Sequence, residues 1–386
     1  MRLRPQPLQL AVGSIAVGMA VFLTGVAVAW QSSSEPRVLR TEPGPAIEVA
    51  APLDIVEPGL DTPVTEPPAA VAQVVDPSAT VAPETTLPPA TKPATKPATT
   101  AEKKTAAVAA KPRATSSATA PFAGMGTWVD VFDWSPSYAK GQPVKLGPGA
   151  VDAMADNGVQ VLYIQTTRAD YTGGGDIVDP LVLKQWLARA DARGLQVVAW
   201  YLPTLTDVGA DLRRLKSTAT LGSVDGIGID IESKAVVDHD ERSRRLVELS
   251  RLARAALAGI PLSAITLPNV VTDVINLNYW PRFPWAGIRP FYDVWQPMSY
   301  WTNRRSDSPY RNAELYTREN IERMRTSLGD PNAVVHPIGG IGDQTTTGDI
   351  QGFVRAIRQT GSIGGSLYDW STQSTSSYAP MRAIRS

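Results

Sequence analysis

Eight apolar runs, each bounded by turn-forming residues, divide residues 122–386 of this 386-residue chain, and helical patterns lie between most of them. The runs are Thr127–Trp134, Gln160–Gln165, Gln196–Leu202, Gly222–Ile231, Leu262–Leu267, Tyr292–Tyr300, Ala333–Ile338 and Ser362–Tyr368. Eight strand–helix units in about 250 residues have the size of a closed (β/α)8 barrel. We therefore predict a TIM barrel over 122–386. An open doubly wound sheet is the alternative, but no glycine-rich phosphate loop follows the first run.

The helical patterns carry their own start and stop signals. Asp179-Pro180 has the composition of an N-cap followed by the first helical residue, and Asp238 or Asp240 begins a second strong helix. Gly329 and Gly361 each follow a helical pattern, as is typical of helix ends. The connection between the fifth and sixth runs is the weakest helical pattern.

The N-terminal segment, residues 1–30, has the composition of a targeting sequence. Arg2 and Arg4 precede an uncharged apolar run, Leu8–Trp30, that is long enough to span a bilayer. Positive charge on the N-terminal side alone predicts a cytoplasmic N-terminus and an extracytoplasmic remainder. Ala27-Val28-Ala29 also matches a signal-peptidase site. The segment is therefore either a signal anchor or a signal peptide, and the rest is membrane-anchored or secreted into the cell wall.

Residues 31–121 contain no Phe, Trp or Tyr and hold sixteen of the chain's 33 prolines. Such a composition cannot bury enough apolar surface to offset the entropy lost on ordering. We predict a disordered, proline-rich linker of partly polyproline-II character.

Charge and residue usage exclude several functions. Lys plus Arg and Asp plus Glu both total 37, so no basic field favours nucleic acid as a partner. There is no cysteine, and only His239 and His336 could supply imidazole. We therefore predict no metal centre and no cofactor, and any acid–base chemistry must depend on carboxylates.

The C-terminal ends of barrel strands form the functional face of this fold, and polar side chains concentrate there. The residues at or just after these ends are Asp130, Trp134, Gln165, Arg168, Trp200, Tyr201, Asp230, Glu232, Gln296, Tyr300, Trp301, Asp369 and Trp370. Of these, Trp134, Trp200, Trp301 and Trp370 are predicted to form an aromatic rim for sugar rings. Core filling is the interpretation preferred for Trp128 and Trp186.

The fourth run carries the sharpest signal. Strand alternation places Ile227, Ile229 and Ile231 on one face and the carboxyls of Asp230 and Glu232 on the other, with Cα atoms about 6.6 Å apart. Two like charges at this range raise the pKa of one carboxyl, which can then act as a general acid. A structural ion pair with Arg168 or another arginine of the barrel is the alternative.

The segment from Asp225 to Glu232 resembles the signature of glycoside hydrolase family 18, the chitinase-like enzymes, and Gln296-x-Met298-x-Tyr300 resembles that family's sixth-strand motif. Gly228 and Trp301 stand where that family has acids. Val129-Asp130-Val131, Asp179-Pro180 and Asp230-Ile231-Glu232 are similar to the lysozyme-like glycoside hydrolase family 25.

Either resemblance implies a hydrolase in which Glu232 protonates the glycosidic oxygen and Asp230 orients an N-acetyl group or balances developing positive charge. Asp130 is then a further electrostatic or water-positioning carboxylate. Substrate-assisted attack by the sugar's acetamide would suit the close pair, with Tyr300 as a hydrogen-bond donor to it. The substrate-binding set is completed by Gln296, Arg168, Tyr201, Trp134, Trp301, Asp369 and Trp370.

Two classes of function remain. The first is a hydrolase of N-acetylated wall polysaccharide, either peptidoglycan or a chitin-like glycan. The second is a non-catalytic glycan-binding or wall-associated scaffold barrel, which the replacement of two family acids favours. Fold alone does not choose between them.

Overall fold

The computed structural model describes residues 117–385. The predicted targeting segment, residues 1–30, and residues 31–116 of the predicted linker lie outside these residues. The described chain starts with a 3-10 helix, η1 (Ser117–Phe122), so regular structure begins five residues before the expected domain boundary. Across 117–385, no helix is both long and apolar enough to cross a membrane.

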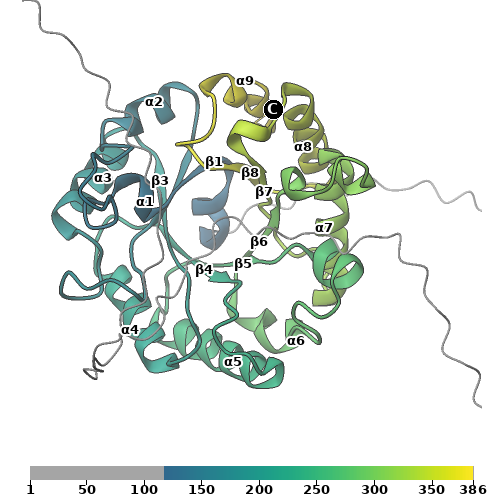
Figure 1. The fold of residues 1–386 in the computed structure, drawn as a ribbon, viewed down its shortest axis with the longest axis horizontal. Coiled ribbons are helices and arrows are strands. Elements are labelled where there is room, and N and C mark those ends of the chain that lie inside the picture. Colours follow the sequence, from purple (N-terminus) through teal and green to yellow (C-terminus); the bar gives the residue numbers. More distant parts are fainter. Residues whose placement is uncertain (1–116, 386) are drawn as a thin grey trace, which may run out of the picture. The chain divides into compact units, whose positions relative to one another are not determined.

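Eight parallel strands close into a barrel in sequence order, each hydrogen-bonded to its neighbours in the chain and β1 to β8 (Figure 1). The strands are β1 (Gly124–Val129), β2 (Val161–Gln165), β3 (Gln196–Tyr201), β4 (Gly226–Ile231), β5 (Leu262–Thr266), β6 (Val294–Ser299), β7 (Ile338–Ile341) and β8 (Gly364–Tyr368). The predicted (β/α)8 barrel is confirmed.

Helices surround this barrel and alternate with its strands (Figure 1). They are α1 (Val131–Trp134), α2 (Ala150–Asp156), α3 (Pro180–Ala192), α4 (Val208–Ala219), α5 (His239–Ala256), α6 (Trp285–Ile288), α7 (Ala313–Leu328), α8 (Thr347–Thr360) and α9 (Tyr378–Met381). The connection from β5 to β6 contains only a π-helical turn and the four-residue α6, in agreement with its weak sequence pattern.

Local sequence explains where the helices begin and end. Asp238 caps α5, because its side chain accepts a hydrogen bond from the backbone nitrogen of Glu241 at 2.8 Å. Gly329 and Gly361 end α7 and α8 in the left-handed region, at φ 61° and 63°, where a side chain is unfavourable. Asp179 precedes α3 as expected, but its carboxylate does not cap that helix.

Two of the predicted runs, the first and the seventh, differ most from the observed strands. The first run was expected to extend to Trp134, but β1 ends at Val129 and the chain turns into α1. The turn forms because the Asp130 carboxylate accepts a hydrogen bond from the backbone nitrogen of Phe132 at 2.8 Å. The seventh run was expected at Ala333–Ile338, whereas β7 begins at Ile338.

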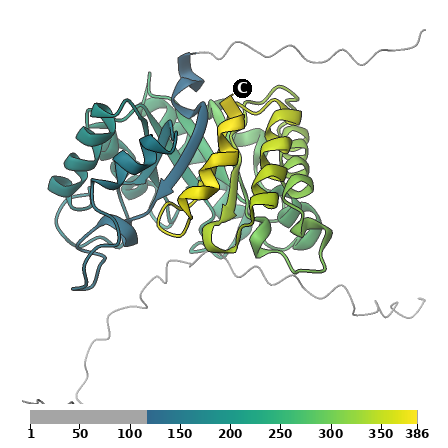
Figure 2. The ribbon, with the colours of Figure 1, turned by 90° about the horizontal axis from the view of Figure 1, so that it is seen from above.

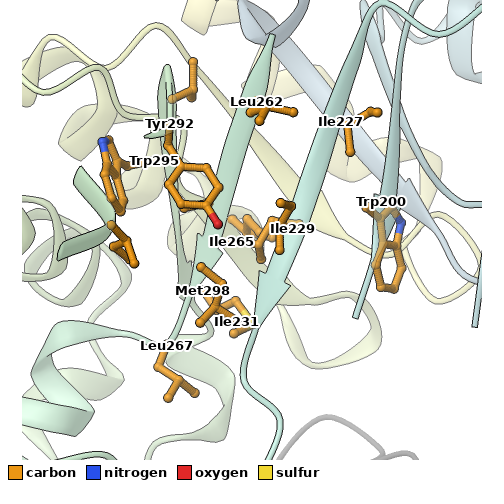
Figure 3. Close-up of a cluster of buried hydrophobic side chains, with 14 of the residues drawn as sticks. Trp200, Ile227, Ile229, Ile231, Leu262, Ile265, Leu267, Tyr292, Trp295 and Met298 are labelled. Atoms are coloured by element: carbon orange, nitrogen blue, oxygen red, sulfur yellow. The ribbon is translucent and has the colours of Figure 1, made fainter. Parts of the chain in front are cut away.

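The side chains of β4 follow the predicted alternation. Ile227, Ile229 and Ile231 are buried in a large apolar cluster that also contains Leu262 and Trp295 (Figure 3). Their burial against neighbouring strands and helices fixes the opposite face of β4 toward the barrel interior. The orientation of the two carboxyls is thus determined by the packing of the isoleucines.

A buried histidine links the first 3-10 helix to the barrel. Nδ1 of the fully buried His336 lies 2.7 Å from the backbone oxygen of Phe122, which links η1 to the β7 region. Burial lowers the pKa of His336 to about 4, so its imidazole is neutral at physiological pH. Figure 2 shows η1 and the C-terminal end of the described chain at the same end of the barrel, and η8 (Arg382–Arg385) contacts β1.

The barrel closes between β1 and β8 at a backbone contact that tolerates no side chain. A Cβ atom on Gly364 would overlap the backbone oxygen of Gly124 and lie 2.7 Å from its nitrogen. We expect Gly364→Ala to lower the free energy of unfolding by about 3 kcal/mol or to prevent folding, since rigid backbone cannot move aside. Gly147→Ala is the control, because no atom lies within 4 Å of its Cβ position. Equal denaturation midpoints for the two variants would contradict this account of the closure.

Candidate active site

A cavity of about 390 Å³ opens where the C-terminal ends of the strands meet the loops. Its lining includes four carboxyls, five aromatic rings and a few aliphatic and polar groups. The lining residues are Trp128, Asp130, Phe132, Lys145, Gln165, Arg168, Trp200, Leu202, Asp230, Glu232, Ile265, Met298, Tyr300, Ile338, Ile341, Tyr368, Asp369 and Thr372. The volume lies within the range of small-molecule sites, and the position is the functional end of this fold.

Asp230 and Glu232 both line the cavity, as their spacing predicts. Only 8% of Asp230 is exposed, and its Oδ1 has no hydrogen-bond partner among the described residues. Burial, and secondarily the charge of Glu232, raise the pKa of Asp230 well above its usual range. Burial also raises the pKa of Glu232 to about 7, and the nearby Lys234 opposes this shift.

The origin of these shifts differs from the sequence argument, in which the charge of one carboxyl was expected to perturb the other. Burial is the larger cause at both residues. Burial and the charge of Glu232 both favour the neutral form of Asp230. Glu232 is poised between its two protonation states, as a general acid requires.

The alternative interpretation, an ion pair of these carboxyls with Arg168, is wrong. The guanidinium of Arg168 binds Asp170 through two hydrogen bonds of 2.8 and 2.7 Å. Its carbon lies over the rings of Phe132 and Tyr138, at 4.8 and 5.0 Å from their centres. Across residues 117–385, neither Asp230 nor Glu232 forms an ion pair.

The wall formed by β1 and β8 carries a second acidic group. Asp130 accepts a 3.1 Å hydrogen bond from the Tyr368 hydroxyl, and burial together with the charges of Asp133 and Asp369 raises the pKa of Asp130 to about 7. Asp369 accepts bonds from Ser371 and Thr372, and burial raises its pKa. Asp130 therefore stands on a different wall from Glu232.

Tyr300 lies between the two acidic walls. Burial, followed by the charges of Asp230, Glu232 and Asp369, raises its pKa well above the usual range. Its ring centre lies 5.8 Å from that of Tyr368, whose hydroxyl binds Asp130. Tyr300 can thus present a neutral hydroxyl to a ligand that touches both walls.

Carboxylate oxygens of Asp130, Asp133 and Asp369 lie within 4.8 Å of one another, a spacing that could accommodate a cation. The ammonium of Lys145 already approaches this group, 3.0 Å from Asp133. This lysine supplies the positive charge that three clustered carboxyls require. That the protein uses no metal and no cofactor stays a prediction from the sequence.

Three predicted rim tryptophans do not reach the cavity. Trp134 is fully buried and donates to the backbone oxygen of Gln165 at 3.2 Å, because α1 turns it away from the strand direction. Trp301 is also fully buried and packs on Phe353, since alternation after Tyr300 directs it outward. Trp370 packs on Tyr378.

Two further residues that were predicted to bind substrate, Tyr201 and Gln296, do not line the cavity. Tyr201 faces outward from β3 and bonds Asp211 at 2.5 Å, one residue after the inward-facing Trp200. Gln296 is fully buried one pleat below Met298, where its Oε1 accepts a 2.6 Å bond from Ser263. Arg168, Tyr300 and Asp369 do line the cavity.

The structure adds cavity residues that the sequence prediction missed. Trp128 was expected to be core filling, yet it lines the cavity while its ring stacks on Tyr163 at 4.3 Å. Its position two residues before Asp130 was the available signal, because both lie on one face of β1. Phe132 and Lys145 come from turns and loops, where alternation gives no guidance.

No protein-family model matches this chain, and no curated protein sequence matches it. Among solved structures, the C-terminal domain of a putative chitinase from Desulfitobacterium hafniense DCB-2 is similar, with a TM-score of 0.51 and 10% identity over 68% of this chain and 98% of that one. The spore cortex-lytic enzyme SleL from Bacillus megaterium QM B1551 has a TM-score of 0.48 and 9% identity, covering 68% of this chain and 74% of its own.

The exo-beta-1,4-mannosidase Op5Man5 from Opitutaceae bacterium strain TAV5 has a TM-score of 0.48 and 14% identity over 64% of this chain. This chain spans about half of the mannosidase structure, 52%. The likeness to this chitinase domain concerns the fold alone, a (β/α)8 barrel.

The positions of Phe132 and Trp134 predict opposite effects of truncation. Trp134→Ala should lower the free energy of unfolding by about 3–5 kcal/mol, because it empties a fully buried site. Phe132→Ala should cost far less, since that ring is 37% exposed, but should weaken oligosaccharide binding. Denaturation and calorimetric titration of both variants test this. A small loss of stability in Trp134→Ala would contradict the core position of this ring and support the predicted position at the rim of the cavity.

Proposed function

We propose that the barrel is a glycoside hydrolase acting on an amino-sugar polysaccharide, an N-acetylated cell-wall polymer of the peptidoglycan or chitin-like class. The observation that carries the proposal is Glu232. It lines the cavity at the end of β4, has no ion-pair partner among residues 117–385, and titrates near pH 7. A carboxyl in this state can protonate a glycosidic oxygen at neutral pH.

Other cavity groups fit the remaining roles. Asp130, on the β1–β8 wall and away from Glu232, is placed to orient an attacking water. Asp230 and Tyr300 can bind the 2-acetamido substituent of the sugar. The buried indole nitrogen of Trp200 has no partner among the described residues, so it can donate a hydrogen bond to the oxygen of a sugar hydroxyl.

A second candidate, a non-catalytic glycan-binding barrel, is favoured by Gly228. A Cβ there would lie 2.9 Å from Cδ1 of Ile265 and 3.3 Å from Oγ of Ser263. The space that a family 18 acid would need is therefore filled by aliphatic packing. Such a barrel would bind glycan in the same cavity without cleaving it.

The location of the domain is part of the proposal. The apolar segment of residues 8–30, with arginines only before it, supports export of the rest of the chain. A wall polymer is accessible to a domain outside the membrane, so this placement suits the proposed substrate.

Glu232→Gln should abolish turnover while leaving fold and glycan binding intact, because the amide matches the carboxylic acid in shape but cannot deliver a proton. The assay is the appearance of new reducing ends from N-acetylated wall glycan, with Glu322→Gln on the outer face of α7 as the matched control. Undiminished turnover in Glu232→Gln would show that Glu232 is not the general acid. A wild-type protein that binds but never cleaves would establish the binding barrel instead.

The pH profile should follow from the same carboxyl. The general acid must be protonated, so we expect kcat/KM to fall as pH rises through about 7, the pKa of Glu232. Lys234→Met removes the positive charge that opposes the shift and should move this alkaline limb to higher pH. Rate measurements between pH 4 and pH 9, analysed alongside circular dichroism, separate this effect from unfolding. An unmoved limb would mean that another group controls the rate.

A further inference from the structure

We propose that the sugar bound beside Asp230 carries a free, protonated amino group, so that the polymer is a partly de-N-acetylated amino polysaccharide. The inference rests on the proposed glycosidase function and specifies its substrate. The inference follows from two properties of the cavity: most of its hydrogen-bonding groups are acceptors, and the negative charge of its carboxyls is not fully compensated by cations of the protein.

The cavity offers more acceptors than free donors, although the indole nitrogen of Trp200 is a donor without a partner among the described residues. Asp130, Asp230, Glu232 and Asp369 all contribute carboxyls to its lining. An ammonium group offers three donors and no acceptor, whereas an acetamide nitrogen offers one donor and adds a carbonyl acceptor. An ammonium therefore complements this set of oxygens better than an acetamide does.

The positive groups of the lining are already engaged. Arg168 binds Asp170 through two hydrogen bonds, and Lys145 binds Asp133 at 3.0 Å. The charge of Lys145 acts on the side of the cavity that holds Asp130 and Asp369, whereas Asp230 and Glu232 have no ion-pair partner among residues 117–385. A cationic ligand would supply the missing compensation and relieve the cost of charging buried acids.

Asp230 shows that one acceptor awaits a partner. More than nine-tenths of this residue is buried, it lines the cavity, and its Oδ1 has no hydrogen-bond partner among residues 117–385. Buried polar atoms are normally bonded, so an unpartnered one that lines a cavity marks a ligand position. A bound ammonium would satisfy this oxygen.

The aromatic lining identifies the source of the ammonium as a sugar. Trp128, Trp200, Tyr300 and Tyr368 all line the cavity, and flat rings suit pyranose faces. The same faces attract a positive charge held close to the ring plane. A 2-amino-2-deoxy sugar presents both features within one ring, unlike a lysine side chain.

The test measures binding of two glucosamine tetramers to the full chain, one fully de-N-acetylated and one fully N-acetylated. Titrations are run by calorimetry at about pH 6 in the Glu232→Gln background, which prevents turnover. We expect the ammonium-bearing tetramer to bind about tenfold more tightly or better, a typical contribution of a charge-assisted hydrogen bond. Its affinity should fall with added salt, while that of the neutral tetramer should not.

Substitution locates the preference. Asp230→Asn, added to this background, should reduce the affinity for the ammonium-bearing tetramer about tenfold. The affinity for the neutral tetramer should change little. Asp191→Asn, on the exposed face of α3, removes the same charge far from the cavity and should change neither. If Asp230→Asn fails to fold, the salt dependence and Asp369→Asn test the same charge interaction.

Three outcomes would overturn the inference. These are equal or tighter binding of the N-acetylated tetramer, no binding of the ammonium-bearing tetramer, and a preference that survives in both Asp230→Asn and Asp369→Asn. Tri-lysine binding as tightly as the ammonium-bearing tetramer would reject the sugar as the source. Release of reducing ends from N-acetylated glycan by the wild type is scored separately, so the proposed hydrolase can stand when this inference fails.

Discussion

Closure of the parallel sheet is the constraint on which the rest of the structure depends. In a closed barrel each strand side chain has two directions, inward or toward the helices, and burying one set fixes the other. On β4 the isoleucines occupy the outer direction, so Gly228, Asp230 and the following Glu232 are committed to the interior. Carboxyls enter a low-dielectric cavity because apolar packing on the opposite face outweighs the cost of their burial.

That burial is also the main source of the site's chemistry. At Asp130, Asp230, Glu232 and Asp369 it is the largest cause of the raised pKa, ahead of any neighbouring charge. The causes then differ within the pair: the charge of Glu232 adds to burial at Asp230, whereas the charge of Lys234 opposes burial at Glu232. Two carboxyls of similar intrinsic acidity at the end of one strand are therefore perturbed by different neighbours.

The sequence predicted the barrel, the inward pair on β4 and the Asp130 position because each depends on period-2 alternation within a strand. It failed where alternation stops. Trp134 is carried into the core by a helical turn that begins at Asp130, and Lys145 reaches the cavity from a loop of unpredictable path. Trp301 and Tyr201 were misplaced for another reason: each is adjacent to an inward residue, Tyr300 or Trp200, and so must point outward.

Gly228 determines which groups surround Asp230 and so influence its protonation. Its place in the interior is taken by Ile265, the register partner of Asp230 on β5, so no carboxyl lies directly beneath Asp230. A third acid at that position would set the protonation of Asp230 from below, within the protein. Without it, burial and the charge of Glu232 favour the neutral form of Asp230, and a positive group in the cavity would favour the charged form. Ionisation of Asp230 is therefore coupled to what occupies the cavity, and a cationic ligand is the one that favours the charged form.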